Sequence, residues 1–212
     1  MAVEPLQPDH VIVGWRDLDE GIAYLEKLSG YRAALGGSHP GKGTRNALLK
    51  MGERSYLEIL APDPEQPHLA WHQEILSLNE PLLVGWAVAV QKIEGYAERL
   101  RAKDVACVGP TAGSRTKPDG QELKFKTLMR EDDNSGILPF YIEWAENSPH
   151  PASNAPGGCL FVRMFQSGQL IQRAAPGPGF EPKLLPNKPA QLHVFIAGLY
   201  GEFELTSKAI QP

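Results

Sequence analysis

The feature that most constrains the fold of this chain is a repeated order of short sequence patterns. Residues 10–13 form a β-branched run, after which Asp17 stands as a helix N-cap and apolar residues recur at helical spacing over 21–28. The same order of strand and amphipathic helix returns at residues 82–90 and 93–101. Because a repeated supersecondary unit buries its apolar face against its copy, this duplication predicts two modules packed together.

Three strand patterns follow each of the two helices. In the first copy they cover 31–35, 46–51 and 55–60, and in the second they begin at 106–109 and continue at 122–130 and 138–144. The closing strands share the pattern Tyr-aliphatic-Glu, which ends on Glu58 in the first copy and on Glu143 in the second. The glycine-rich residues 36–43 are predicted to form a loop. The fold class that follows is α+β, with paired β-α-β-β-β modules that form a curved, cup-shaped mixed sheet with its helices outside.

Changes in composition divide the chain into four segments. Residues 1–62 are predicted to form the first module, 63–81 a linker with a short helix, 82–151 the second module and 152–212 a C-terminal annex. The annex is rich in proline and glycine, yet it contains strand-like runs at 159–165, 191–196 and 202–206. We expect a β-rich annex or half module packed on the core.

Composition and charge exclude several classes of function. The 212 residues carry a formal net charge of −4 and lack the basic excess that phosphate binding along DNA or RNA requires. No apolar run reaches the roughly 18 residues of a membrane-spanning helix, and the N-terminus shows no leader pattern. The two cysteines, Cys107 and Cys159, lie beside aliphatic residues, as buried reduced thiols do. We therefore expect a cytoplasmic protein with no nucleic-acid or membrane partner.

Motifs for nucleophilic and nucleotide chemistry are missing from the sequence. There is no Gly-x-Ser-x-Gly elbow, and neither cysteine lies in an activating setting. The glycines of residues 36–43 do not join a strand to a helix and lack the Lys-Ser/Thr ending of a phosphate-binding loop. The candidate site must therefore come from other side chains.

One histidine and two glutamates are the candidate metal ligands. Side chains alternate along a strand, so Glu58 and Glu143 each lie on the more polar face of a closing strand, and His10 opens the first strand. If the curved sheet brings His10, Glu58 and Glu143 to one concave face, they form a reasonable triad for a divalent metal ion. The alternative is that both carboxylates are solvated strand residues and that His10 is a hydrogen-bonded residue at a strand start.

Further candidates for ligand binding follow the glycine-rich stretch. His39, Arg45 and Asn46 lie where backbone amides and a guanidinium can meet an anionic group, although a hairpin whose glycines only serve the turn is the alternative. Arg115 is either a carboxylate binder at the cup or a surface residue. Trp144 faces away from Glu143 by strand alternation and is assigned to core packing. Four other histidines are assigned structural or exposed positions: His68, His72, His150 and His193.

Several motifs also carry a family resemblance. They are Asp9-His10-Val11-Ile12-Val13, His39 to Asn46, Tyr56 to Ile59, Ser114-Arg115 before Pro118-Asp119-Gly120, and Leu138 to Trp144. Together with the order of elements they resemble the glyoxalase-like branch of the vicinal-oxygen-chelate superfamily, from Asp9 to Pro151. That superfamily includes glyoxalase I, extradiol dioxygenases, epimerases and resistance proteins for fosfomycin or bleomycin.

The resemblance implies a metal site with ligands on the first and last strands of each module. His10 matches the first ligand, Glu58 the second and Glu143 the last. The remaining position falls on Gly85, or on Trp86 after a shift of one residue, and neither side chain holds a metal ion. The metal ion, which would be Zn, Ni, Mn or Fe, is therefore held by three groups and water or is absent, and His39 is a further candidate ligand from its loop.

Two main functions are consistent with this resemblance. The first is a metal-assisted lyase, isomerase or related enzyme acting on a small oxygenated metabolite, with Glu143 as general base and Arg45 or Arg115 holding an acid group. The second is a metal-free protein that binds or sequesters a small molecule, as bleomycin-resistance proteins do, with a homodimer as its expected assembly. A third possibility is that the annex covers the cup and that the protein serves mainly as an interaction module.

Overall fold

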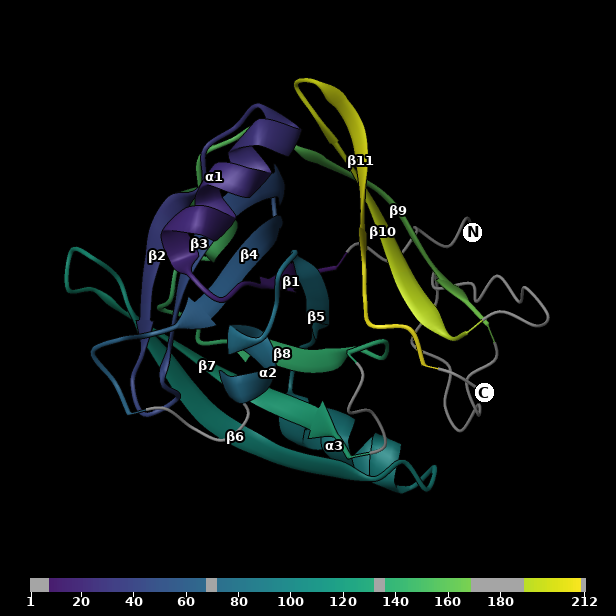
Figure 1. The fold of residues 1–212 in the computed structure, drawn as a ribbon. Coiled ribbons are helices and arrows are strands. Elements are labelled where there is room, and N and C mark those ends of the chain that lie inside the picture. The colour runs from purple at the N-terminus through teal and green to yellow at the C-terminus, as the bar shows by residue number, and fades with distance from the viewer. Residues whose placement is uncertain (1–7, 68–71, 132–135, 169–188, 211–212) are drawn as a thin grey trace.

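The computed structural model describes residues 8–67, 72–131, 136–168 and 189–210 (Figure 1). Eight strands form a closed barrel in the order β1-β4-β3-β2-β6-β7-β8-β5. The first module supplies β1 (His10–Gly14), β2 (Ala34–His39), β3 (Thr44–Gly52) and β4 (Ser55–Pro62), and the second supplies β5 (Leu82–Ala89), β6 (Cys107–Thr116), β7 (Glu122–Arg130) and β8 (Phe140–Trp144).

The pairing of the strands follows the duplication. β1 pairs in parallel with β4, and β5 pairs in parallel with β8. The other pairings in the barrel are antiparallel, and the two modules join where β1 meets β5 and where β2 meets β6. The predicted α+β fold with two β-α-β-β-β modules is confirmed, and both modules lie within one chain.

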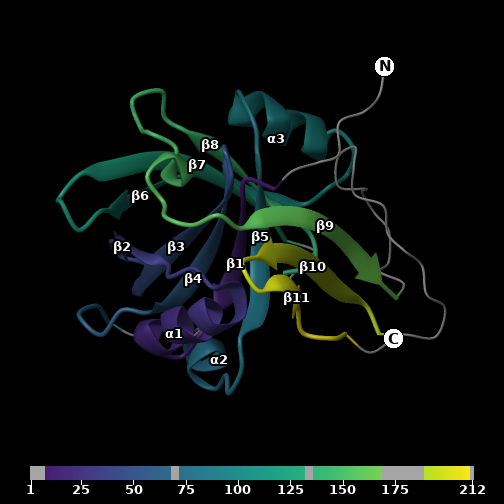
Figure 2. The ribbon, with the colours of Figure 1, turned by 90° about the horizontal axis from the view of Figure 1, so that it is seen from above.

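The helices cover the outside of the barrel. α1 (Leu18–Ser29) and α3 (Ile93–Arg101) lie on opposite sides of it, as Figure 2 shows, and α2 (His72–Leu76) lies in the linker. α1 begins where the Asp17 side chain accepts a hydrogen bond from the Glu20 amide at 3.0 Å. None of the helices that the structure describes is long and apolar enough to cross a membrane.

The glycine-rich stretch that was predicted as a loop is strand in its first half, 36–39, and turn in its second half, 40–43. β2 runs through Gly37 to His39, and only residues 40–43 form the turn into β3. A bulge in β2 interrupts its pairing with β3 between Leu35 and Gly37. A Cβ on Gly37, whose φ is 131°, would lie 1.8 Å from the Thr116 carbonyl oxygen of β6. Glycine is therefore needed where β2 and β6 approach to close the barrel.

The main hydrophobic core lies between the outer face of the first module and the elements that cover it. Ile22 of α1 packs into this core with the outward-facing Leu57 and Ile59 of β4. A smaller cluster under α3 joins Ile93 to the outward-facing Tyr141 of β8. Because the outward residues of the strands are used in this way, the inward residues are left to form the site.

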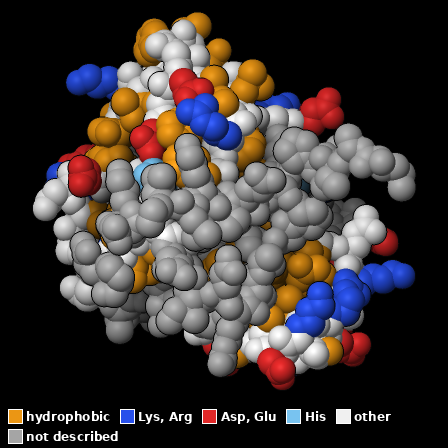
Figure 3. Space-filling view, turned by 90° about the vertical axis from the view of Figure 1, so that its right-hand side faces the viewer, with side chains coloured by type: hydrophobic (Ala, Val, Ile, Leu, Met, Phe, Trp, Pro, Cys, Tyr) orange, Lys and Arg blue, Asp and Glu red, His pale blue; other side chains and the backbone are white. Residues whose placement is uncertain are grey.

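The C-terminal annex is a separate antiparallel sheet with the strand order β11-β10-β9. It consists of β9 (Leu160–Ser167), β10 (Gln191–Gly198) and β11 (Gly201–Thr206), and follows a short 3₁₀ helix, η1 (Pro151–Ser153). Val194 and Ile196 of β10 belong to the same core as α1, so the expectation of a β-rich annex packed on the core is confirmed. In Figure 3 hydrophobic side chains are exposed at the top of the annex side, where Figure 1 places the turn between β10 and β11.

Candidate active site

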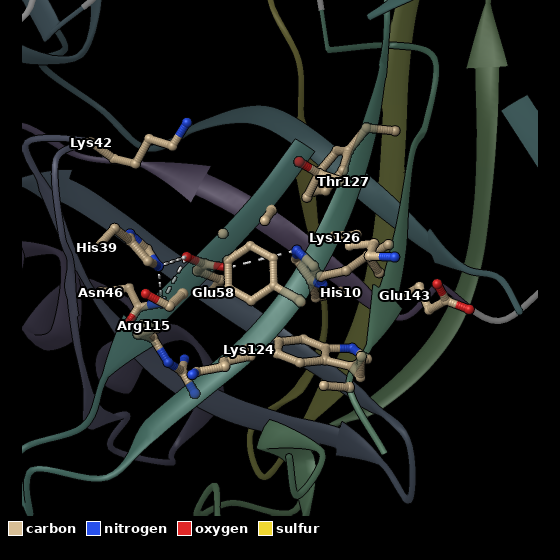
Figure 4. A pocket seen from close by; sticks show the side chains of 18 of the residues that line it. His10, His39, Lys42, Asn46, Glu58, Arg115, Lys124, Lys126, Thr127 and Glu143 are labelled. Carbon is tan, nitrogen blue, oxygen red and sulfur yellow. Dashed lines mark hydrogen bonds and ion pairs between the residues drawn. The ribbon is translucent and has the colours of Figure 1, made fainter. Parts of the chain in front are cut away.

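The barrel surrounds a cavity of about 1070 Å³, seen from close by in Figure 4. A polar cluster from four strands of the first module lines one part of it: His10 on β1, His39 on β2, Asn46 on β3 and Glu58 on β4. Apolar side chains of β7 and β8 line another part, among them Phe125, Met129, Phe140 and Ile142. No described residue of the annex lines this cavity, so the annex strands do not cover the cup.

His10 is held in a fixed orientation in the cavity wall. Its Nδ1 donates a hydrogen bond to Asp9 Oδ1 at 2.7 Å. Its ring stacks on Tyr56 with the ring centroids 4.7 Å apart, and Phe140 meets it edge-on. Its Nε2 lies 3.8 Å from Glu58 Oε2. Because Asp9 accepts the Nδ1 hydrogen, Nε2 is the ring nitrogen that points toward Glu58.

Asp9 orients more than one side chain. Its Oδ2 also accepts hydrogen bonds from His150 Nε2 at 3.0 Å and from Trp144 Nε1 at 3.1 Å. Burial alone would raise the pKa of Asp9, but the hydrogen bonds from His10 and His150 outweigh it and hold that pKa well below its ordinary value. Asp9 is therefore an ionised carboxylate that fixes the tautomer of His10.

Glu58 is held by the Asn46 amide. Asn46 Nδ2 donates to Glu58 Oε1 at 2.8 Å and also approaches His39 Nε2 at 3.3 Å. His39 Nδ1 lies 3.0 Å from Thr44 Oγ1. Burial lowers the pKa of His39, with the nearby Glu58 carboxylate opposing this effect. His39 therefore favours the neutral form, in which Nδ1 donates to Thr44 and Nε2 accepts from Asn46.

The two predicted arginines lie in different places. Arg115 of β6 is buried and lines the cavity. Arg45 of β3 does not line it, because Thr44 and Asn46 face the cavity and side chains alternate along the strand. The structure thus brings together His39, Asn46 and Arg115, and ligand binding by Arg45 stays a prediction.

Glu143 is not brought to the polar cluster. Its carboxylate accepts hydrogen bonds from the backbone amides of Lys92 at 2.5 Å and Ile93 at 3.5 Å, so it caps the N-terminus of α3. It lies at the edge of the cavity in Figure 4, with its oxygens away from His10 and Glu58. The prediction that Glu143 converges with these residues as metal ligand and general base must be corrected, because Phe140 and Ile142 occupy the cavity face of β8.

The side chains in the cavity do not fit the expected metal site. Within the described ranges, no group of three or more His, Cys, Asp or Glu residues is arranged to hold a metal ion. Gly85 pairs with Ile12, which lines the cavity, but supplies no ligand atom. Asn46 Nδ2 already contacts both His39 Nε2 and Glu58 Oε1, the atoms that would bind a metal ion. We therefore derive no chemical step through a metal ion.

Sequence reasoning missed Asp9 and His150 and misplaced Trp144. Trp144 does face away from Glu143, but it lines the cavity and donates to Asp9. His150 is buried and bonded to Asp9 across most of the chain length. The one local signal was Asp9 itself, a carboxylate directly before His10 at the start of a β-branched strand.

The duplicated modules and the closed barrel define a member of the vicinal-oxygen-chelate superfamily. The model of the glyoxalase-like domain family matches residues 9–168, and the chain belongs to this family. No curated protein sequence matches the chain.

Solved structures show the same fold at low sequence identity. A hypothetical protein from Staphylococcus aureus is 15% identical, with a TM-score of 0.60 over 94% of this chain and 84% of that protein. A variant of methylmalonyl-CoA epimerase from Streptomyces coelicolor, in complex with 2-nitronate-propionyl-CoA, is 18% identical, with a TM-score of 0.50 over 69% of this chain and 99% of the epimerase. The Staphylococcus aureus structure thus covers the larger share of this chain, and both similarities concern the fold alone.

Proposed function

We propose that this protein is an enzyme of the glyoxalase-like family that moves a proton on a small oxygenated molecule bound inside the barrel. The observation that carries the proposal is the buried pair of His10 and Glu58, with Nε2 and Oε2 only 3.8 Å apart at the cavity wall. Nδ1 of His10 is bonded to Asp9, so Nε2 is the ring nitrogen that faces Glu58, and 3.8 Å is too long for a hydrogen bond between Nε2 and Oε2. A proton-donating group of a substrate bound in the cavity beside these two atoms can reach both of them.

His10 is the residue that we assign as general base. It takes a proton from a carbon next to a carbonyl group, and the imidazolium that forms lies between the Asp9 and Glu58 carboxylates, which stabilise its charge. The electron pair left on the substrate moves onto the carbonyl oxygen and forms an enolate. Delivery of the proton to another atom of the enolate, or to the opposite face of the same carbon, completes an isomerisation without a co-reactant. This assignment replaces Glu143 as base.

The proposal does not use the metal ion of the sequence hypothesis. The donor atoms of His39 and Glu58 are engaged by Asn46, and Glu143 caps α3. Dialysis against a chelator is therefore expected to leave proton transfer unchanged, as measured with the assay below. A loss that Zn, Ni, Mn or Fe restores would contradict this part of the proposal.

Metal-free ligand binding without catalysis is the second candidate function. The apolar lining from Phe125, Phe140 and Ile142 favours it, because burial of a ligand's apolar surface supplies affinity without any chemical step. The same residues serve a substrate equally well, so only an assay of chemistry separates the two functions. The cytoplasmic location expected from the sequence is part of the proposal and is supported by Cys107 and Cys159, which are both free thiols.

Exchange of carbon-bound hydrogen tests the proposal, and the product of the reaction need not be identified. A panel of small oxo acids, hydroxy acids and their thioesters is incubated with the protein in heavy water, and proton NMR follows loss of the signal next to the carbonyl group. His10→Gln is expected to slow the exchange by about 10²- to 10⁴-fold.

His193→Gln is the matched control for this assay. His193 lies in the annex, where it contacts Ser167 and Glu204, and it does not line the cavity. This variant is expected to keep full exchange. Equal exchange in the wild type and His10→Gln would overturn the proposal, and binding of panel compounds without exchange would favour the second candidate.

A further inference from the structure

Arg115 is a buried cation without a partner among the described residues. Its side chain comes from β6 into the cavity, and the residue is only 4% exposed. The structure gives it no hydrogen bond or ion pair to any residue of the described ranges, and its Nε is fully buried without an acceptor. Burial of an unpaired charge is costly, so a site that keeps one is suited to a ligand that supplies the missing negative charge.

Three cations on the neighbouring strand β7 have partners. Lys124 forms an ion pair with Glu122 at 3.2 Å, and Lys126 pairs with Glu94. Arg130, which is 6% exposed on the outer face of β7, hydrogen-bonds the Tyr141 hydroxyl. Arg115 differs from these residues because the described residues give it neither a carboxylate within ion-pair distance nor a hydrogen-bond acceptor.

Arg115 lies next to the polar cluster. The side chains of Asn46 and Arg115 contact the same side of Gly36. A Cβ built on Gly36 would lie 2.3 Å from Asn46 Oδ1 and 3.0 Å from Arg115 Nη1. Asn46 in turn donates to Glu58 at 2.8 Å. A group bound by Arg115 is therefore close to Glu58, as the arrangement of the labelled side chains in Figure 4 shows.

An apolar surface begins beside the same guanidinium. Arg115 and Gly113 lie on one face of β6, and Gly113 pairs with Phe125, whose ring would be 2.6 Å from a Cβ at that position. Phe125 continues into the apolar lining formed with Phe140 and Ile142. The cavity thus presents a buried guanidinium beside a broad hydrophobic wall, and Lys42, Lys124 and Lys126 also line the cavity.

We propose that the ligand of this cavity is a carboxylic acid with an apolar body, whose carboxylate pairs with Arg115. The guanidinium of Arg115 matches one carboxylate through two parallel hydrogen bonds. The apolar body lies against the wall formed by Phe125, Phe140 and Ile142. This inference rests on the proposed function in one respect: if the cavity is an active site, the carboxylic acid is the class of its substrate.

Paired ligands that differ only in charge test the inference. Cinnamate and cinnamamide are titrated by calorimetry into the full-length wild type, Arg115→Met and Arg130→Met. The wild type is expected to prefer cinnamate by about tenfold or more, which corresponds to a charge-assisted hydrogen bond. Arg115→Met is expected to lose that preference while its affinity for cinnamamide stays unchanged.

The melting temperature of each variant shows whether a change in binding comes from a change in folding. Arg115→Met removes an unpaired buried charge and is expected to raise the melting temperature of the ligand-free protein or leave it unchanged. Arg130→Met breaks the hydrogen bond to Tyr141 and is expected to lower it.

Three results would overturn the inference: equal binding of acid and amide by the wild type, a preference for the acid that persists in Arg115→Met, and binding of inorganic phosphate as tight as that of cinnamate. The same titration with Glu58→Gln separates this inference from the proposed function. Retained preference for cinnamate in that variant, together with lost hydrogen exchange, supports the carboxylate site and the separate role of Glu58. Lost preference in Glu58→Gln would contradict the assignment of recognition to Arg115.

Discussion

The closing strands of the two modules carry the same Tyr-aliphatic-Glu pattern but turn it toward opposite sides of the barrel. In β4, Tyr56 and Glu58 face the cavity, whereas in β8 Tyr141 packs beneath α3 and Glu143 caps that helix. A shift of one residue along a strand moves every side chain to the other face. The comparison teaches that a repeated pattern identifies a repeated element and leaves open which of its faces forms the site.

The difference has a physical cause in the two helices. α1 has Asp17 as its own N-cap, so Glu58 is free to face the cavity. α3 has Lys92 at its N-cap without a side-chain cap, and the Glu143 carboxylate satisfies its first amides instead. The same residue type therefore serves the site in one module and helix stability in the other.

Among the variants proposed, removal of the Asp9 carboxylate is expected to change the stability of the protein most. Asp9→Asn replaces an acceptor of three hydrogen bonds with an amide, which removes the anionic acceptor shared by His10 of the first module and by Trp144 and His150 of the second. The free energy of unfolding is expected to fall by roughly 3–5 kcal/mol, as for other broken buried charge pairs. Urea unfolding measures this loss, and a change below about 1 kcal/mol would show that Asp9 is not a structural anchor.

Asp9 is also a positioning residue, since it acts on the substrate only through His10. In Asp9→Asn we expect the pH dependence of hydrogen exchange to shift, because the bond that fixes the tautomer of His10 is weakened. A variant that loses only stability and keeps the pH profile of the wild type would be evidence against this role.

Glu143→Ala is expected to affect stability by a smaller amount. The helix α3 loses the side chain that accepts hydrogen bonds from Lys92 and Ile93, at a cost of about 1–2 kcal/mol in the free energy of unfolding. Glu146→Ala, at an exposed position, is the control and is expected to change nothing. Equal stability of Glu143→Ala and Glu146→Ala in urea would argue that the cap is not stabilising.

The smallest effect expected is a pH dependence of stability from His39. Burial lowers its folded pKa below the ordinary value of 6.5, so the unfolded chain binds more protons between the two pKa values. The stability contribution is complete above about pH 6.5 and is lost as the pH falls toward the folded pKa.

Comparison of the wild type with His39→Gln isolates this contribution. The difference in unfolding free energy between the two proteins is expected to change as the buffer is acidified from about pH 8 to about pH 5. Asp9 does not enter this window, because its pKa is held below an ordinary value of 3.8 and its contribution is lost only in stronger acid. A constant difference across the range would show that His39 is not buried in its neutral form.

Local patterns were sufficient to predict much of the fold. β7 spans Glu122–Arg130, the range that strand alternation predicts, and α1 has the expected cap at Asp17. The glycine-rich stretch was misread because its glycines serve a long-range contact, the approach of Gly37 to Thr116 of the other module. Neighbours in sequence do not reveal such a contact.

The candidate site was predicted only in part for a similar reason. His10, His39, Asn46 and Glu58 do meet, because each faces inward from an adjacent strand of one module. The bonds from Asp9 to Trp144 and His150 span the two modules, and no local pattern encodes them. The division of the chain at residues 62, 81 and 151 stays a prediction.

The measurement that tests the central claim most directly compares Glu58→Gln with Glu143→Gln in the hydrogen-exchange assay. Both variants change one carboxylate to an amide in the same sequence pattern, so they differ only in the face of the barrel that is altered. We expect Glu58→Gln to slow exchange by about 10²-fold or more and Glu143→Gln to keep the wild-type rate. The opposite result, a loss with Glu143→Gln and none with Glu58→Gln, would contradict a site formed by the first module.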